Sequence, residues 1–341
     1  NRIYAISPGS VSFLEDIKIW SAINKSRITP VYDMEIFGDD NSAHLDFNAY
    51  DVGITELAFI VENRQLQAAA WNELKKQGAN IEIFCPMQCT SIEWNKTQAN
   101  IHLSDGESLQ TALVIGADGV NSWVRNKAEI EVSQHSYQQS AMVANFNSDL
   151  SHQNIARQWF RRDGILALLP LPDKSISMVW SANKDQANHL SNLSEKDLCR
   201  QVEEASNNTL GKLQLITSPV SFPLHSVHVK SLVKPRLALI GDAAHGIHPL
   251  AGQGVNLGLR DVRKLVTTII DRGGQADCGD YMLLRQYERA RKEDILTMEL
   301  TTDSLQKLFN SKNLTISRLR NLGLIITNQL PLLKKRLMQN A

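Results

Sequence analysis

The sequence lacks an excess of charge of either sign, because its 341 residues carry 36 Lys and Arg against 36 Asp and Glu. A general nucleic-acid binder needs a surplus of basic residues to neutralise phosphates. The balance therefore excludes nucleic acid as the expected partner. Along the chain, however, the charge is uneven. Residues 304–341 hold seven basic residues and no acidic one, whereas residues 1–303 hold 29 basic and 36 acidic ones.

Cysteine is scarce as well. The four cysteines are too few and too scattered to form a disulfide framework: Cys85, Cys89, Cys199 and Cys278. A reducing compartment is the interpretation that this usage favours.

Long apolar runs are also missing. A helix that spans a bilayer needs about 20 mostly apolar residues. The nearest stretch, 322–333, is interrupted by polar residues and a proline, and no secretory signal peptide is visible. These absences predict a cytoplasmic protein.

What the chain does have is enough apolar residues for a core, at 43% hydrophobic, which excludes a disordered chain. Its length exceeds what one core usually serves, so we expect two lobes. Helix–strand patterns occupy 1–24, 56–130 and 226–280, strand-rich patterns occupy 25–55 and 131–225, and 281–341 is helical. The sequence predicts a mixed α/β fold of two interleaved lobes with a C-terminal helical segment.

Four local patterns give sharper predictions. Alternating apolar residues over 31–47 predict a hairpin with one wet face, and residues 81–84 look like a further strand. Ser194 begins a capping box ahead of a helix that reaches about Ala205. From Gly254 we expect a helix whose inward face carries Val255, Leu259, Val262, Val266 and Ile269.

The first motif with chemical content is Gly116-Ala-Asp-Gly119, which follows an apolar strand. Two glycines let a ligand approach the backbone closely, and Asp118 would lie at the carboxyl end of the strand, where open α/β sheets bind ligands. The alternative is an ordinary Asp-Gly turn.

The second motif runs from Leu239 to Gly258. A strand delivers Asp242, which could accept hydrogen bonds from a sugar or ribityl hydroxyl. A loop and a Gly-rich helix start follow. The backbone N–H groups near Gly252 and Gly254 would suit an anion or an electron-rich ring edge, because the helix dipole is positive there.

Three other interpretations of the second motif are weaker. The spacing Gly252-x-Gly254-x-x-x-Gly258 misses the dinucleotide fingerprint and lacks the acidic residue that should follow. His245 and His248 are three apart, but no carboxylate or thiolate at ligand spacing completes a metal site. A Ser-His-Asp triad is not supported, since no nucleophile elbow is present.

Together the two motifs resemble those of the single-component flavin aromatic hydroxylases, the family of para-hydroxybenzoate hydroxylase. The residues that carry the resemblance are Gly116-Ala-Asp-Gly-Val-Asn-Ser with Arg125, and Gly241-Asp-Ala-Ala-His through Val262. Within that family, residues 60–67 and the opening Arg2-x-x-Ala-Ile-Ser resemble the ubiquinone-biosynthesis branch, which hydroxylates polyprenylated phenols. The resemblance implies a Rossmann-like FAD lobe (1–24, 56–130 and 226–280) and an antiparallel substrate lobe (25–55 and 131–225).

The resemblance also implies site residues. Asp118 and Gly119 would lie near the FAD pyrophosphate and assist NAD(P)H, and Asp242 beside Gly241 would bind the ribityl chain. The segment against the isoalloxazine ring would be Pro249, Gly252, Gln253, Gly254, Val255 and Asn256. Arg64 would reach the FAD phosphates or ribityl chain, with Arg2 near the same cofactor. For Arg64 the alternative is a solvated arginine at a helix start.

The reaction that the resemblance implies consumes O₂ and NAD(P)H and hydroxylates the ring through a flavin hydroperoxide. The cofactor supplies the reactivity, while the protein positions the ring and excludes water. Candidates for the pocket wall, or alternatively for the sheet core, are Tyr32, Met34, Trp159, Leu168, Trp180 and Phe222. No base for the phenol proton is identified. His248 and His225 are candidates, with a hydrogen-bonded structural histidine as the alternative for each.

One departure from the family concerns the beginning of the chain. The family starts with a strand, a Gly-x-Gly-x-x-Gly turn and a helix, and this sequence opens at Asn1 without them. We expect that first βαβ unit to lie upstream. Residues 1–341 alone would then hold FAD poorly, because the helix that binds the pyrophosphate is not among them.

The basic segment 304–341 has three interpretations. Basic and apolar residues at helical spacing suit peripheral contact with the inner face of an anionic membrane. Alternatively, the segment forms a docked helix pair with a solvated basic face, or it binds protein partners of a biosynthetic complex. Homo-oligomerisation is left open. A lipid-directed flavin reductase or epoxidase and a flavin-free assembly subunit remain the alternative functions.

Overall fold

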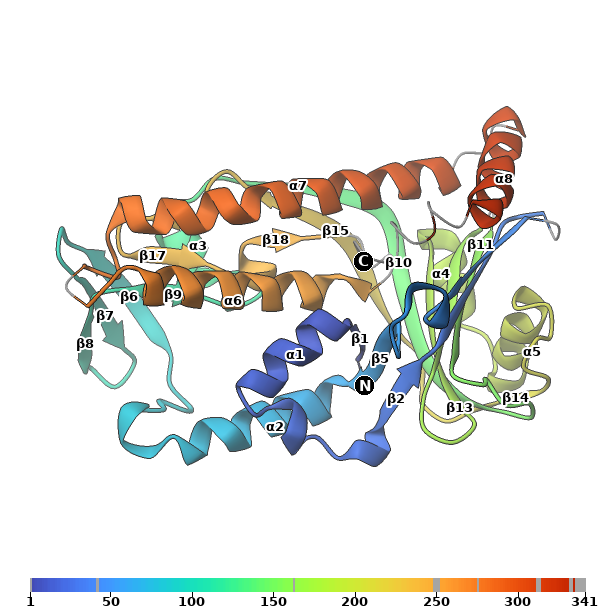
Figure 1. Cartoon of the computed structure of the whole chain (residues 1–341), viewed down its shortest axis with the longest axis horizontal. Coiled ribbons are helices and arrows are strands. Elements are labelled where there is room, and N and C mark those ends of the chain that lie inside the picture. Colours follow the sequence, from blue (N-terminus) through green and yellow to red (C-terminus); the bar gives the residue numbers. More distant parts are fainter. Residues whose placement is uncertain are drawn as a thin grey trace. The chain divides into compact units, whose positions relative to one another are not determined.

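The computed structural model describes residues 2–40, 43–161, 163–247, 252–274, 276–310, 314–330 and 334 (Figure 1). The chain forms two compact units: unit 1 comprises 1–73, 136–224 and 303–341, and unit 2 comprises 74–135 and 225–302. Residues 1–24 and 56–73, predicted for the helix–strand lobe, lie in unit 1. The assignment of FAD binding to one lobe stays a prediction.

Unit 1 is built around a large, mainly antiparallel sheet. Its elements are β1 (Ile3–Ile6), α1 (Pro8–Asp16), η1 (Trp20–Ala22), η2 (Lys25–Arg27), β2 (Ile28–Val31), β3 (Asp33–Phe37), β4 (His44–Asn48), η3 (Tyr50–Val52), β5 (Ala58–Glu62), most of α2 (Asn63–Lys76), most of β10 (Val132–Ser148), β11 (Ile155–Arg161), β12 (Gly164–Pro170), β13 (Ser175–Asn183), α4 (Lys184–Ser191), α5 (Glu195–Ala205), β14 (Leu213–Leu215), half of β15 (Val220–Val229), the end of α7 (Tyr281–Asn310) and α8 (Leu314–Gln329).

The strands of this sheet follow the order β15-β10-β13-β12-β11-β3-β4, with β14 also paired to β10. All the pairs described are antiparallel except β3 with β11. The predicted hairpin over 31–47 is confirmed as β3 and β4, with Met34 opposite Phe47. The predicted strand candidates between 141 and 180 correspond to β10, β11, β12 and β13.

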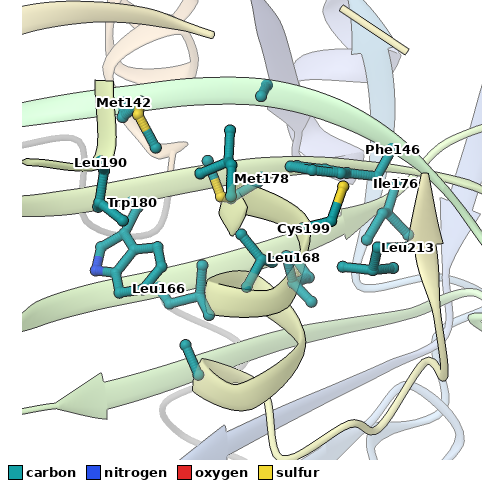
Figure 2. Packing of buried hydrophobic residues seen from close by; sticks show 14 of the residues in the cluster. Met142, Phe146, Leu166, Leu168, Ile176, Met178, Trp180, Leu190, Cys199 and Leu213 are labelled. Atoms are coloured by element: carbon teal, nitrogen blue, oxygen red, sulfur yellow. The ribbon is translucent and has the colours of Figure 1, made fainter. Parts of the chain in front are cut away.

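One face of this sheet carries the main core of unit 1 (Figure 2). Trp180 pairs across the strands with Met142 and Leu166, and helices α4 and α5 cover this face with Leu190, Cys199 and other apolar residues. Ser194 accepts a hydrogen bond from the Asp197 amide (3.2 Å), which confirms the predicted cap of α5.

The opposite face of the sheet packs against the small sheet β1-β5-β2. Val31 and Ile60 of the small sheet bury themselves against Ala156 of β11 and against Leu171. This second layer explains why residues 1–24 and 56–73 belong to unit 1: their strands have their apolar partners there.

Helix α8 covers the hairpin end of the same unit. The Asp46 amide of β4 donates to Asn328 (3.1 Å), and Asp39 accepts hydrogen bonds or ion-pair contacts from Asn321 (2.8 Å) and Arg320 (2.5 Å). Among the helices described, none is both long enough and apolar enough to cross a membrane.

Unit 2 combines small sheets with the short helix α3 and the longer helices α6 and α7. Its elements are η4 (Gly78–Asn80), β6 (Cys89–Trp94), β7 (Ala99–Leu103), β8 (Ser108–Thr111), β9 (Val114–Gly116), α3 (Trp123–Lys127), β16 (Val233–Lys234), β17 (Leu237–Leu239), η5 (Gly241–Ala243), β18 (His245–Gly246), α6 (Gly254–Asp271) and most of α7. Strands β9 and β17 are parallel neighbours. Leu257 and Leu265 of α6 and Leu284 and Tyr287 of α7 pack in the core of this unit.

Two local predictions are wrong in unit 2. Residues 81–84 form no strand, and Ile81 and Ile83 are 42% and 37% exposed, because no described strand lies alongside to pair with them. In α6 the buried face consists of Asn256, Leu257, Asp261, Leu265 and Thr268, whereas Val266 is exposed. Apolar periodicity missed this face because three of its five members are polar, and Asp261 among them is bonded to His245, Arg291 and the Gly241 amide.

Candidate functional site

The Asp242 loop, residues 241–245, follows directly from β17. Gly241 has a φ of +59°, a conformation that residues with a Cβ rarely adopt. Ala243 and Ala244 are buried at 0% and 1% exposure, whereas Asp242 is exposed. The Asp242 carboxylate makes no hydrogen bond with the part of the chain that the structure describes. A fixed loop thus presents one free carboxylate.

A single buried carboxylate, that of Asp261 in α6, holds this loop. Its Oδ2 accepts from the Gly241 amide (2.9 Å) and lies 2.6 Å from His245 Nε2. Its Oδ1 accepts from Arg291 Nε of α7 (2.8 Å). Asp261 is 0% exposed, His245 2% and Arg291 4%. The ion pair accounts for burial of these charges, because a buried charge needs a partner and full hydrogen bonding.

The N-terminus of α6 lies next to the loop. Gly252 has a φ of +64°, Gln253 is the N-cap residue, and the helix begins at Gly254. Among the described residues, a Cβ added at Gly254 or at Gly241 would meet no atom within 4 Å, whereas one at Gly258 would lie 3.3 Å from the Gly241 Cα. The open space leaves room for a ligand, and the amides of the first helical turn are available to donate hydrogen bonds to it.

The other residues predicted for this segment differ in placement. Asn256 is 1% exposed, and its Nδ2 lies 3.5 Å from Gln253 Oε1, while Val255 is half-buried. Pro249 and His248 lie outside the described residues.

The Asp118 turn uses its carboxylate internally. Asp118 Oδ1 accepts from Ser122 Oγ (2.5 Å) and Oδ2 accepts from the Val124 amide (3.0 Å), while Gly119 has a φ of +83°. These bonds stabilise the start of α3, as the turn interpretation requires. The proposed roles of Asp118 and Gly119 toward FAD and NAD(P)H stay predictions.

Arg125 joins the two motifs. Its side chain, 2% exposed, donates from Nη2 to the Val120 carbonyl (2.9 Å) and from Nη1 to the Ala243 carbonyl (3.0 Å). Burial lowers the pKa of this guanidinium, and the nearby Asp118 carboxylate acts in the opposite direction. The Asp118 turn and the Asp242 loop are therefore tied together inside unit 2.

Arg2 and Arg64 lie in unit 1, at one end of the β1–β5 pair. The Asn63 amide donates to the Arg2 carbonyl (2.8 Å), which places the start of α2 beside the start of β1. Both arginines are exposed, and the Arg2 guanidinium lies 5.7 Å from the Tyr4 ring centroid. The two residues are therefore close along the backbone, and we refer to them as the basic pair.

The six candidates for a pocket wall lie in different surroundings. Trp159, Leu168 and Trp180 belong to the core under α4 and α5, so the core alternative is confirmed for them. Met34 packs on the opposite face. Tyr32 is 43% exposed, Phe222 is half-buried, and His225 is exposed on β15.

Sequence reasoning missed Asp261, Arg291 and the linking role of Arg125. Asp261 and Arg125 stand within the quoted motifs, but only their partners show what they do. The sequence carried no signal for the role of Asp261, because it lies off the apolar face predicted for this helix.

Comparison with known proteins identifies the family. The chain matches the model of the FAD binding domain family over residues 5–299. It belongs to the FAD binding domain family. The loop described above fits such a cofactor, since an exposed carboxylate and glycines with open space among the described residues lie beside a helix N-terminus.

Relatives within the family are hydroxylases. The chain is 33% identical over 341 residues to 3-demethoxyubiquinol 3-hydroxylase of Escherichia coli K12, covering 100% of this chain and 86% of that protein. It is 32% identical over 384 residues to the ubiquinone biosynthesis monooxygenase COQ6, mitochondrial, of Xenopus tropicalis, covering 100% and 82%. This member of the FAD binding domain family is an FAD-dependent monooxygenase, acting with O₂ on a small molecule.

A solved structure supports the fold. The p-nitrophenol 4-monooxygenase PnpA of Pseudomonas putida DLL-E4 is similar with a TM-score of 0.79 at 16% identity, covering 99% of this chain and 87% of that one. At this identity the likeness shows the fold alone. It confirms the mixed α/β architecture predicted from the sequence.

Proposed function

We propose that this flavoenzyme hydroxylates an aromatic ring of a ubiquinone precursor, a polyprenylated phenol or quinol, and takes its electrons from NAD(P)H. The observation that carries the proposal is similarity over all of this chain, at 33% and 32% identity, to two enzymes whose names refer to a ubiquinol or to ubiquinone biosynthesis. Bound FAD supplies the oxygen chemistry, and the protein binds, orients and shields the reactants.

Within unit 2, the residues of the Asp242 loop would bind the cofactor. The Asp242 carboxylate, exposed and without a partner in the described chain, would accept hydrogen bonds from ribityl hydroxyls. The first-turn amides of α6 at Gly254, Val255 and Asn256 would face the electron-rich edge of the ring system, where the helix dipole favours negative charge. Pro249 and Gln253 would line the same segment.

Within unit 1, the basic pair Arg2 and Arg64 would contact the phosphates or the ribityl chain. Both guanidinium groups are exposed, and Arg64 lies in the first turn of α2. Arginine suits phosphate because its planar group can donate two parallel hydrogen bonds.

The experiment uses the full-length gene product with a prenylated phenol carrying one isoprene unit, NADPH and ¹⁸O₂. We expect a yellow protein whose product gains one ¹⁸O atom, with O₂ and NADPH consumed in equal amounts when the reaction is coupled. A protein that cannot be reconstituted with FAD, or NADPH oxidation that proceeds without oxygen and leaves the ring unlabelled, would contradict the proposal.

Asp242→Ala supplies the residue-level arm of this experiment. It should weaken FAD binding by about tenfold or more, as expected for loss of hydrogen bonds to a charged group, with little change in stability because the side chain is exposed. Asp105→Ala, on an exposed turn of the same unit, is the matched control.

We also propose that the segment 304–341 makes peripheral contact with an anionic membrane, where a polyprenyl substrate would reside. Its seven basic residues have no acidic neighbours in the segment. On α8 and just beyond it, Leu322, Ile326 and Leu330 recur every four residues and are 50%, 46% and 47% exposed. Exposed apolar residues within a basic segment favour such contact.

A further inference from the structure

The buried Asp261 carboxylate of unit 2 accepts from three different parts of that unit. It is fully buried and receives the Gly241 amide, the His245 ring and the Arg291 guanidinium at 2.6–2.9 Å. The first two donors are the two ends of the Asp242 loop. Asp242 therefore lies between two residues that are fixed to the same carboxylate.

We propose that Asp261 is a positioning residue for cofactor binding, which acts by holding the Asp242 loop in the form that presents Asp242 to the polyol chain of FAD. This inference rests on the proposed role of Asp242. Burial of Ala243 and Ala244 holds the middle of the loop against the core. The Gly241 amide and the His245 ring, which we call the two anchors, fix its ends on Asp261. A preorganised carboxylate binds more tightly, because no ordering cost remains to be met on binding.

Arg291 orients the Asp261 carboxylate. Its Nε donates to Asp261 Oδ1, a second ion pair joins it to Asp294, and its Nη2 lies 3.5 Å from the Leu257 carbonyl. The loop is thus attached through α6 to the middle of α7. With both oxygens of Asp261 in use, neither anchor can shift without disturbing the other.

Unit 2 contains a second buried carboxylate that provides a matched control. Glu288 of α7 is 2% exposed and accepts from Ser231 Oγ (2.7 Å) and the Leu232 amide (2.8 Å), and Arg285 is its ion-pair partner. The chemistry is that of Asp261, but the loop that it holds is 231–232. A purely structural role would make the two carboxylates equivalent toward FAD.

The experiment compares Asp261→Asn with Glu288→Gln in the full-length protein. FAD is titrated into the apoprotein and followed by flavin fluorescence and visible absorption, and the thermal midpoint of each variant is recorded. Both variants should lose stability. Only Asp261→Asn should weaken FAD binding, by about tenfold, with a changed flavin spectrum. His245→Gln, which removes one anchor and spares the Asp261–Arg291 pair, should weaken binding several-fold if Asp261→Asn does not fold.

A double substitution tests the route of action. If Asp261 acts through Asp242, adding Asp261→Asn to Asp242→Ala should leave the dissociation constant within about twofold of that of Asp242→Ala alone. Additive effects, equal losses of affinity in Asp261→Asn and Glu288→Gln, or unchanged affinity in both Asp261→Asn and His245→Gln would overturn the inference. A wild-type protein that binds no FAD would overturn the proposed function itself.

Discussion

Several buried charged side chains in this molecule bond main-chain groups of loops. Arg125 donates to two carbonyls, and Asp261 and Glu288 each accept from a backbone amide. Such bonds satisfy buried backbone groups that lie outside helices and strands. At the residue scale, these three charged side chains therefore fix the conformation of loops to which they do not belong.

His152 in unit 1 gives a pH dependence at this scale. It is 4% exposed, its Nε2 donates to the Leu171 carbonyl (2.9 Å), and its Nδ1 accepts from the Asn154 amide (3.0 Å), so the ring is neutral. Burial lowers its pKa below the usual value of 6.5, an effect that Arg157 reinforces and the hydrogen bonds to Leu171 and Asp173 oppose.

The sign of the effect follows from proton binding. Below a pH of about 6.5 the unfolded chain binds a proton at His152 that the folded chain does not, so the free energy of unfolding falls as the pH falls. His152→Gln should flatten this slope between pH 6.5 and 5, measured by urea unfolding at each pH, although it lowers stability at pH 7. His189→Gln, exposed on α4, is the control. An unchanged slope in His152→Gln would contradict the prediction.

At the scale of elements, α6 joins the loop and the core. Its first turn lies beside the Asp242 loop, its middle supplies Asp261, and Leu257 and Leu265 pack in the core of unit 2. A helix fixed at its middle holds its first turn in place.

Gly258→Ala tests the close approach of α6 to the loop. A Cβ there would lie 3.3 Å from the Gly241 Cα, so the loop must shift by a few tenths of an ångström. Alanine in a helix interior is about 1 kcal/mol better than glycine, so thermal stability should stay the same or rise while FAD affinity falls several-fold. Gly323→Ala on α8, where the Cβ would meet no atom within 4 Å, should leave FAD affinity unchanged. Unchanged FAD affinity in Gly258→Ala would contradict the prediction that the close approach of α6 to the loop determines FAD binding.

Elements whose signals are local could be predicted from the sequence. The 31–47 hairpin and the helix capped by Ser194 carry their period and their cap within a few residues. The strand predicted at residues 81–84 is absent because a strand also needs a neighbouring strand to pair with, which a local apolar run does not reveal.

The candidate site shows the same division. Asp242 was singled out because a strand and a Gly-rich turn deliver it. Asp261 was missed because its partners, His245 and Arg291, come from a loop and from another helix. Hydrophobic periodicity treats a carboxylate as outward-facing, and only tertiary contacts reverse that expectation.

At the scale of the whole molecule, charge separates along the chain rather than averaging to zero. The segment 304–341 carries all of its charge as seven basic residues, while the remainder has an acidic excess. Such separation favours contact between the basic end and an anionic surface.

Vesicle binding measures this contact. Leu322→Ser with Ile326→Ser should reduce co-sedimentation with phosphatidylcholine–phosphatidylglycerol vesicles by roughly tenfold or more, as the loss of two inserted side chains implies. Binding should also fall with added salt and with removal of phosphatidylglycerol. Ile270→Ser, an exposed apolar residue of α6 outside the segment, is the control. Equal binding by wild type and the double variant would contradict the membrane proposal.

The packing of α8 on β4 has a consequence for synthesis on the ribosome. β4 is the last strand of its sheet. Its Asp46 amide donates to Asn328, which is synthesised 282 residues later. At about 5–20 residues per second, that strand stays uncovered for roughly a quarter of a minute to a minute. A free strand edge can pair with another chain, so the growing polypeptide would have its greatest need of a chaperone during that interval.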